Sequence, residues 1–319
     1  MKATLDELDG RPVLRMERRL SHPREKVWRA ITEPERLGRW FPFTVDEMDL
    51  RVGGKIRFGG GMTLDAEITE LDPPRVFAFV QRSTPEAPRE GDNLLRFELS
   101  PEEDGGCLLV FTQVFDDRPA AASYASGWQV CLGALEAVVA GRSPEWPEGN
   151  FPELHQAYVE ALGLAEGVAE EADGRADGTD GRRVRFERQL TRPVEEVWKV
   201  AGAAEARIGA PVPDRLGEGT VTAVRTPGAQ GALGAPGAAP GAEAPAYVEF
   251  TVAPARPDAG PGGPGPAAEG DGRRVRWELS RGTGHGARLV VTDTGATGRA
   301  SVLEAWRDRI ETLARDLVG

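Results

Sequence analysis

The stretch Arg15-Met-Glu-Arg-Arg-Leu-Ser-His-Pro-Arg-Glu-Lys-Val-Trp28 occurs in two related forms in this 319-residue sequence. It returns 170 positions later as Arg185-Phe-Glu-Arg-Gln-Leu-Thr-Arg-Pro-Val-Glu-Glu-Val-Trp198, with eight of fourteen positions identical. Residues 95–100 likewise resemble residues 275–280. Self-similarity of this kind marks a repeated structural unit, and a chain of this length has room for two domains. We therefore predict that one fold is encoded twice.

Each copy opens with a pattern that predicts a half-buried strand and then a short helix. Leu14, Met16 and Leu20 alternate with polar residues, which is the period of a strand. Ser21 and Pro23 follow, as a cap and a first-turn proline would at the start of a helix. The same pattern returns in the second copy at Val184, Phe186, Leu190, Thr191 and Pro193.

Each copy closes with a pattern that predicts a longer amphipathic helix. The apolar positions recur at helical spacing, at Tyr124, Trp128, Cys131, Leu132, Leu135 and Val138 and then at Val302, Trp306, Ile310, Leu313 and Leu317. Between the helices of the first copy lie strand-like segments separated by glycine and proline turns. This order predicts an α+β fold in which a curved antiparallel sheet grips the long helix.

The domain organisation follows from the repeat and from local composition. We expect an intact first domain over residues 1–165, an acidic, glycine-rich linker over 166–181 and a degenerate second domain over 182–319. Within the second domain, residues 226–246 and 253–272 consist largely of Gly, Ala and Pro, which have little to bury. These two stretches are predicted to be loops.

Composition and charge exclude several classes of function. The formal net charge is −12 and no cluster of Lys and Arg offsets it, which argues against nucleic acid or an anionic membrane as a partner. The acidic segment from Met1 to Gly10 does not resemble a signal peptide. No stretch approaches the roughly 20 apolar residues of a membrane span. We expect a cytoplasmic protein that binds no nucleic acid and does not insert into a membrane.

The cysteines and histidines do not predict a metal site. Cys107 and Cys131 each lie in an apolar pattern, so two reduced, buried thiols are expected. His22, His155 and His285 are far apart in the sequence and are expected to be solvated. No phosphate-binding or dinucleotide-binding motif is present, and we predict no cofactor.

Several segments together resemble one known family. They are residues 23–41, the segment Asp49-Leu-Arg-Val-Gly-Gly-Lys-Ile-Arg-Phe58, the segment Leu71-Asp-Pro-Pro-Arg-Val76 and the pair Gly127-Trp128 before the last helix. The first copy is similar in these segments to the activator of heat-shock protein 90 ATPase homologue branch of the SRPBCC (START-like) superfamily. The similarity spans about residues 11–141 and is weaker over 182–318.

This resemblance implies two helix-grip domains in tandem, each with a bent antiparallel sheet wrapped around its C-terminal helix and an apolar cavity between them. Relatives bind lipids, hormones or polyketides, cyclise polyketides, or stimulate a chaperone ATPase. The fold alone does not select among these functions.

The candidate ligand-binding residues are mostly aromatic. Side chains on alternating strand positions face the same interior, and both a filled core and a ligand pocket satisfy this pattern. The candidates are Trp40, Phe41, Phe77, Phe79, Phe97, Phe111, Gln113 and Trp128.

No catalytic residue is predicted. An enzyme of this fold would need a proton-transfer group in its cavity. Glu67, Arg96, Glu98 and Gln113 are the polar residues best placed to point inward, but their neighbours of opposite phase are apolar, so solvent-facing positions explain most of them.

Arg18 and Arg188 occupy equivalent positions in phase with the apolar side of the first strand of each copy. A buried arginine requires a carboxylate partner. An internal ion pair, an anion-binding handle in the cavity, and a bulge that turns the side chain to solvent all remain open.

Three functional hypotheses follow. The first is a non-catalytic protein that binds a hydrophobic, lipid-like or polyketide-like small molecule, or a protein partner, through the first domain. The second is a cyclase/aromatase-like enzyme, and the third is a chaperone ATPase activator-like protein, which depends on the family resemblance alone.

Overall fold

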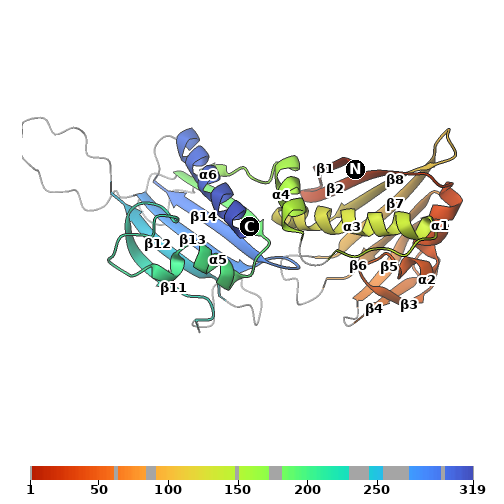
Figure 1. Ribbon diagram of the computed structural model, residues 1–319, viewed down its shortest axis with the longest axis horizontal. Helices are drawn as coiled ribbons and strands as arrows, with labels where there is room; N and C mark the ends of the chain where they lie inside the picture. Colours follow the sequence, from red (N-terminus) through yellow and green to blue (C-terminus); the bar gives the residue numbers. More distant parts are fainter. Residues whose placement is uncertain are drawn as a thin grey trace, which may run out of the picture. The chain divides into compact units, whose positions relative to one another are not determined.

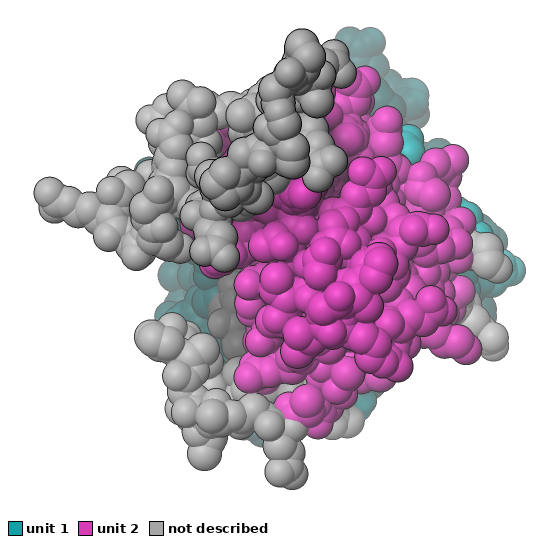
Figure 2. All heavy atoms as spheres, turned by 90° about the vertical axis from the view of Figure 1, so that its left-hand side faces the viewer, with its two compact units in different colours: residues 1–162 teal, residues 163–319 magenta. Residues whose placement is uncertain are grey.

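The chain forms two compact units, Met1–Leu162 (unit 1) and Gly163–Gly319 (unit 2) (Figure 1; Figure 2). The computed structural model describes residues 2–60, 64–83, 91–147, 151–171, 182–229, 244–253, 273–295 and 299–318. Each unit is a mixed α+β structure with one antiparallel sheet and a long helix. The predicted fold class is confirmed.

Unit 1 contains an eight-stranded sheet with the order β1-β2-β8-β7-β6-β5-β4-β3. The strands are β1 (Lys2–Leu8), β2 (Arg11–Leu20), β3 (Thr44–Met48), β4 (Lys55–Gly59), β5 (Leu64–Asp72), β6 (Val76–Gln81), β7 (Asn93–Pro101) and β8 (Cys107–Val114). The helices are α1 (Arg24–Thr32), α2 (Pro34–Leu37), the 3₁₀ turn η1 (Arg118–Ala120), α3 (Ala121–Val139) and α4 (Pro152–Ala161). Helix α3 lies across one face of the sheet, and α4 packs against α3 (Figure 1).

Unit 2 contains a six-stranded sheet with the order β11-β12-β13-β14-β10-β9. Its strands are β9 (Val168–Glu171), β10 (Arg182–Leu190), β11 (Thr220–Arg225), β12 (Ala246–Val252), β13 (Arg273–Arg281) and β14 (Ala287–Thr294). Its helices are α5 (Val194–Val200), the 3₁₀ turn η2 (Ala203–Glu205) and α6 (Arg299–Val318), which lies across the sheet (Figure 1).

Part of the expected linker is a strand. Within residues 166–181, β9 pairs with β10, Val168 lying opposite Arg185; residues 172–181 lie outside the described residues. Most of the two expected loops, 226–246 and 253–272, also lies outside them, but Ala246 begins β12 and pairs with Leu279 of β13. The acidic, glycine-rich composition of residues 166–181 is typical of a linker and does not indicate strand β9.

The two short helices begin without the predicted side-chain caps. Helix α1 starts directly after Pro23 (φ −55°) and α5 directly after Pro193 (φ −59°), and neither has a side-chain cap hydrogen bond. The proline ring already holds φ near its helical value. Proline therefore occupies the N-cap position of each helix, one residue before the first-turn position that the sequence predicted.

The apolar stripes predicted for the long helices are buried against the sheets. Trp128 of α3 is 8% exposed and Trp306 of α6 is 4% exposed. Among the described residues, no helix has the combination of length and apolar character needed to cross a bilayer.

The paired arginines of the repeat form internal ion pairs with the long helices. Arg18 of β2 donates from Nε to Glu136 of α3 at 3.0 Å, and Arg188 of β10 pairs with Glu311 of α6. Alternation along β2 is regular, with Leu14, Met16 and Leu20 buried, so no bulge turns Arg18 to solvent. Each arginine therefore ties the first long strand of its unit to the long helix.

The two ion pairs are expected to differ in their contribution to stability. The Arg188 side chain is 5% exposed and that of Arg18 is 24% exposed. Glu311→Gln, which leaves Arg188 charged and buried, should lower the free energy of unfolding of unit 2 by about 2 kcal/mol. Glu136→Gln should lower that of unit 1 by less than about 1 kcal/mol.

Hydrogen exchange of the full chain, followed by mass spectrometry of peptides from α3 and α6, measures both effects in the same molecule. Glu311→Gln should accelerate exchange in α6 and leave α3 unchanged. Equal effects of the two substitutions would contradict the expectation that the more buried ion pair contributes more to stability.

Candidate ligand-binding pocket in unit 1

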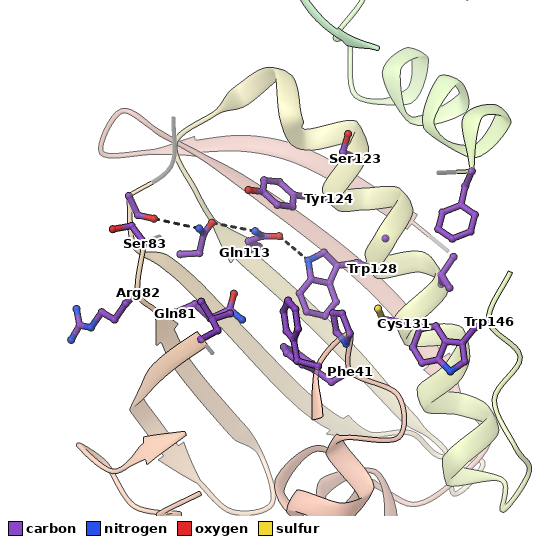
Figure 3. Close-up of a pocket in the computed structure, with 18 residues that line it drawn as sticks. Phe41, Gln81, Arg82, Ser83, Gln113, Ser123, Tyr124, Trp128, Cys131 and Trp146 are labelled. Carbon is purple, nitrogen blue, oxygen red and sulfur yellow. Dashed lines mark hydrogen bonds between the residues drawn. The ribbon is translucent and has the colours of Figure 1, made fainter. Parts of the chain in front are cut away.

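Unit 1 contains a pocket of about 450 Å³ beside α3 (Figure 3). This volume falls in the range of ordinary small-molecule sites. One wall is α3, and the opposite side is formed by the segment after α2 and by the ends of β6, β7 and β8. The lining residues are Phe41, Pro42, Phe43, Leu64, Gln81, Arg82, Ser83, Gly91, Asn93, Gln113, Ser123, Tyr124, Gly127, Trp128, Val130, Cys131, Trp146 and Phe151.

The apolar part of the pocket is built from interlocking aromatic rings. Phe41 stacks on Phe58, with ring centroids 4.9 Å apart, and lies 5.7 Å from Trp128. Trp128 in turn packs on Phe111 at 4.2 Å. Aromatic contacts at these distances fix the ring positions, so Phe41 and Trp128 present firmly held surfaces to the pocket.

Three of the eight candidate ligand-binding residues line this pocket: Phe41, Gln113 and Trp128. The other five are fully buried in the core of unit 1 and are not part of the lining; they are Trp40, Phe77, Phe79, Phe97 and Phe111. Trp40 also uses its indole N–H internally, donating it to the Ala30 carbonyl at 2.9 Å.

The sequence patterns missed several lining residues. Tyr124, Gly127 and Cys131 follow the spacing of one helix face with Trp128, so the helical period contained a signal for them. Trp146 and Phe151 come from the segment between α3 and α4, where no periodic pattern indicates them.

A row of hydrogen-bonded polar side chains forms one edge of the pocket. The indole Nε1–H of Trp128 donates to Gln113 Oε1 at 2.7 Å. Gln113 Nε2 donates to Asn93 Oδ1 at 3.2 Å, and Asn93 Nδ2 donates to the Gly91 carbonyl at 3.4 Å (Figure 3). Gln113 is 3% exposed, so this polar row enters an otherwise apolar interior.

The charged strand residues considered as catalytic candidates lie outside the pocket. Arg96 donates to Glu70 at 2.8 Å and also pairs with Glu98; its hydrogen bond to Glu70 is the main cause of its raised pKa. Glu67 accepts from Arg82 at 3.0 Å. Their side chains are partly exposed, in agreement with the expected solvent-facing positions.

Arg82 is the charged residue of the described lining, and it is already paired. It donates to Asp92 at 2.6 Å and to Glu67. The hydrogen bond to Asp92 is the main cause of its raised pKa, while the backbone N–H of Ser83, with Arg82, lowers the pKa of Asp92. Arg82 therefore stays charged while its charge is offset by two carboxylates.

Helix α4 is fixed on α3 beside the pocket. His155 of α4 is buried, not solvated as expected, and its Nδ1 lies 3.3 Å from Ser123 Oγ. Tyr158 donates its hydroxyl to Gln129 Oε1 of α3, and burial raises its pKa. These contacts hold the segment that carries Phe151.

Both cysteines are free and buried, as predicted. Burial raises the pKa of Cys131 to about 12 and that of Cys107 to about 11. Over the described part of the chain, no cluster of three or more His, Cys, Asp or Glu side chains is arranged to hold a metal ion.

Residues 21–140 match the protein family described as Activator of Hsp90 ATPase homolog 1-like protein. This match confirms the family predicted from the first copy of the repeat. None of the curated proteins matches the chain.

Several solved structures resemble this chain. CalU16 from Micromonospora echinospora is 22% identical with a TM-score of 0.40, over 51% of this chain and 94% of that one. A conserved protein of unknown function from Enterococcus faecalis is 24% identical with a TM-score of 0.41, over 50% and 89%. A protein from Chromobacterium violaceum is 29% identical with a TM-score of 0.35, over 40% and 96%.

The raised pKa of Cys131 predicts a poorly reactive thiol, although this residue lines the pocket. A thiol with a pKa of about 12 stays protonated as pH rises through 8, and only the thiolate reacts rapidly. Iodoacetamide at pH 8 should therefore modify the folded chain at least about tenfold more slowly than the chain unfolded in guanidinium.

Peptide mass spectrometry measures modification of Cys131 and Cys107 separately. In a Cys131→Ala variant, any modification that remains occurs at Cys107, which gives the rate of that site alone. Rapid modification of Cys131 in the folded protein at pH 8 would contradict a desolvated thiol.

Proposed function

We propose that unit 1, whose residues 21–140 match the family described as Activator of Hsp90 ATPase homolog 1-like protein, is a non-catalytic binding domain for a hydrophobic small molecule of lipid-like or polyketide-like character. The observation that carries this proposal is the pocket of about 450 Å³ with aromatic walls and one buried polar edge. A mostly apolar lining with a few placed polar groups is typical of ligand sites.

Helix α3 has a glycine at a position that faces the pocket. Gly127 lies in the middle of this helix and lines the pocket, and a Cβ built there would meet no atom within 4 Å. A glycine inside a helix costs about 1 kcal/mol relative to alanine, and packing does not require it at this position. The open space beside Gly127 supports a ligand pocket over a filled core.

Trp146 also supports a binding role. Its ring lines the pocket and remains 46% exposed. An exposed aromatic ring beside an apolar cavity provides surface that a ligand would cover.

The lining chemistry favours binding over catalysis. A cyclase-like reaction needs an acid or base at the cavity, and the lining residues that the structure describes include no Asp, Glu or His. Cys131, with its raised pKa, is a weak candidate for that task. The chaperone-activator alternative rests on the family description, and no contact among the described residues of unit 1 favours it over ligand binding.

We further propose that unit 2 is a degenerate tandem copy that serves as a structural or interaction module. The repeated sequence, the shared order of short helix, antiparallel strands and long helix, and the repeated arginine–glutamate pair support this assignment. We place the protein in the cytoplasm, where free cysteines such as Cys107 and Cys131 persist.

Filling the pocket from α3 tests the binding function. Gly127→Leu places an apolar side chain in the open space, so it should weaken binding of pocket ligands at least about tenfold, because the ligand loses room that it would otherwise occupy. The helix itself should not be destabilised, since leucine has the higher helix propensity. Isothermal titration calorimetry of the full chain with a panel of fatty acids and naphthyl ketones measures the affinity.

Gly133→Leu is the matched control. Gly133 is a second glycine of α3 with open space at its Cβ, but it does not line the pocket. This variant should bind like the unmodified chain, and urea unfolding should show both variants folded. Unchanged affinity in Gly127→Leu, or no binding of any panel member to the unmodified chain, would refute the proposed function.

A further inference from the structure

The orientation of the polar row in unit 1 is fixed by Trp128. An indole N–H can only donate a hydrogen bond, so the side-chain atom of Gln113 that faces it, 2.7 Å away, is the carbonyl oxygen. The amide nitrogen of Gln113 must then face the other way. This argument removes the usual ambiguity between the oxygen and nitrogen of a glutamine amide.

The same reasoning extends to Asn93. Because Gln113 presents its nitrogen, the Asn93 atom at 3.2 Å is the carbonyl oxygen, and the Asn93 nitrogen faces the Gly91 carbonyl. Each amide nitrogen carries two hydrogens. Each of the two nitrogens donates one hydrogen bond among the described residues, so each retains a second hydrogen at the edge of the pocket.

Unit 2 has a matching row in which these amide donors are replaced by an ion pair. Trp306 Nε1–H donates to Asp293 Oδ2 at 2.6 Å, and Arg273 Nε donates to Asp293 Oδ1 at 2.8 Å. Asp293 is fully buried. The charge of Arg273 is the counterpart that a buried carboxylate requires.

The strand registers place the two rows at equivalent positions. Gln113 of β8 lies opposite Leu95 of β7, and Asp293 of β14 lies opposite Val275 of β13. Asn93 and Arg273 each lie two residues before those partners, on the same side of their strand. The repeat therefore contains one site in an amide form and one in a charge-paired form.

We propose that Asn93 and Gln113 form the polar anchor of the unit 1 pocket and select apolar ligands that carry a neutral hydrogen-bond acceptor, such as a ketone or an ester carbonyl. This inference rests on the proposed binding function and names its ligand class. A buried N–H without an acceptor is costly, so an acceptor at this edge gains affinity that a hydrocarbon of the same shape lacks. The row offers no cation, and Arg82 is already paired with Asp92 and Glu67, so a neutral carbonyl fits better than a carboxylate.

Two probes of the same shape test this selection. 2-Acetylnaphthalene carries a carbonyl where 2-isopropenylnaphthalene carries a C=CH₂ group. The preference for the ketone is the ratio of the two dissociation constants, alkene over ketone, measured by calorimetry on the full chain. Comparing this ratio between variants cancels the different hydration of the two probes.

Gln113→Met has similar length and no donor, and Asn93→Leu removes the second amide. The chain with both substitutions loses both spare amide donors, so its ketone preference should fall about tenfold relative to the unmodified chain. Asn93→Leu alone keeps Gln113 as the acceptor of Trp128. It should lower the preference in the same direction and provides a second test if the double variant does not fold.

The outcomes separate this inference from the proposed function. If both probes bind, Gly127→Leu blocks both, and the ketone preference is the same in all variants of Asn93 and Gln113, acceptor selection is overturned while pocket binding stands. If neither probe nor any other panel member binds the unmodified chain, the proposed function fails and this inference fails with it.

Discussion

The N–H of one tryptophan on the long helix of each unit sets the chemistry of the interior around it. Packing a helix on a sheet buries this indole, and a buried N–H must find an acceptor. In both units the acceptor comes from the last strand before the helix, Gln113 for Trp128 and Asp293 for Trp306. The fold therefore requires a polar group at one defined point of an otherwise apolar interface.

The choice of acceptor then separates the two units. The Gln113 amide accepts the Trp128 N–H through its oxygen and carries no charge. Its nitrogen donates to Asn93 and lies at the edge of the pocket. A carboxylate satisfies Trp306 but is buried with its charge, and Arg273 must neutralise it. The arginine–glutamate pairs between first strand and long helix are present in both units. The units thus share the contact between first strand and long helix and differ in the acceptor that meets the helix tryptophan.

The sequence predicted the sheets and long helices well, because a strand or helix that buries one face must repeat apolar residues with its own period. It predicted the pocket less well. Alternation shows that Phe77, Phe97 and Gln113 all face the inner side of the sheet. It does not show which of these side chains α3 covers completely and which remain open to the pocket. The first two are core residues and Gln113 reaches the pocket. The pairing of β9 with β10 was missed because residues 166–181 have the acidic, glycine-rich composition of a linker.

The pocket of unit 1 extends beyond the segment that matches the family. The match ends at residue 140, yet Trp146 and Phe151 line the pocket, and α4 holds Phe151 in place through contacts of His155 and Tyr158 with α3. Part of the pocket lining therefore belongs to sequence beyond the matched segment. The sheet and α3 supply most of the lining, and these two aromatic residues extend its wall. The family match therefore does not define the whole surface of the pocket, so ligand choice must be established on this chain.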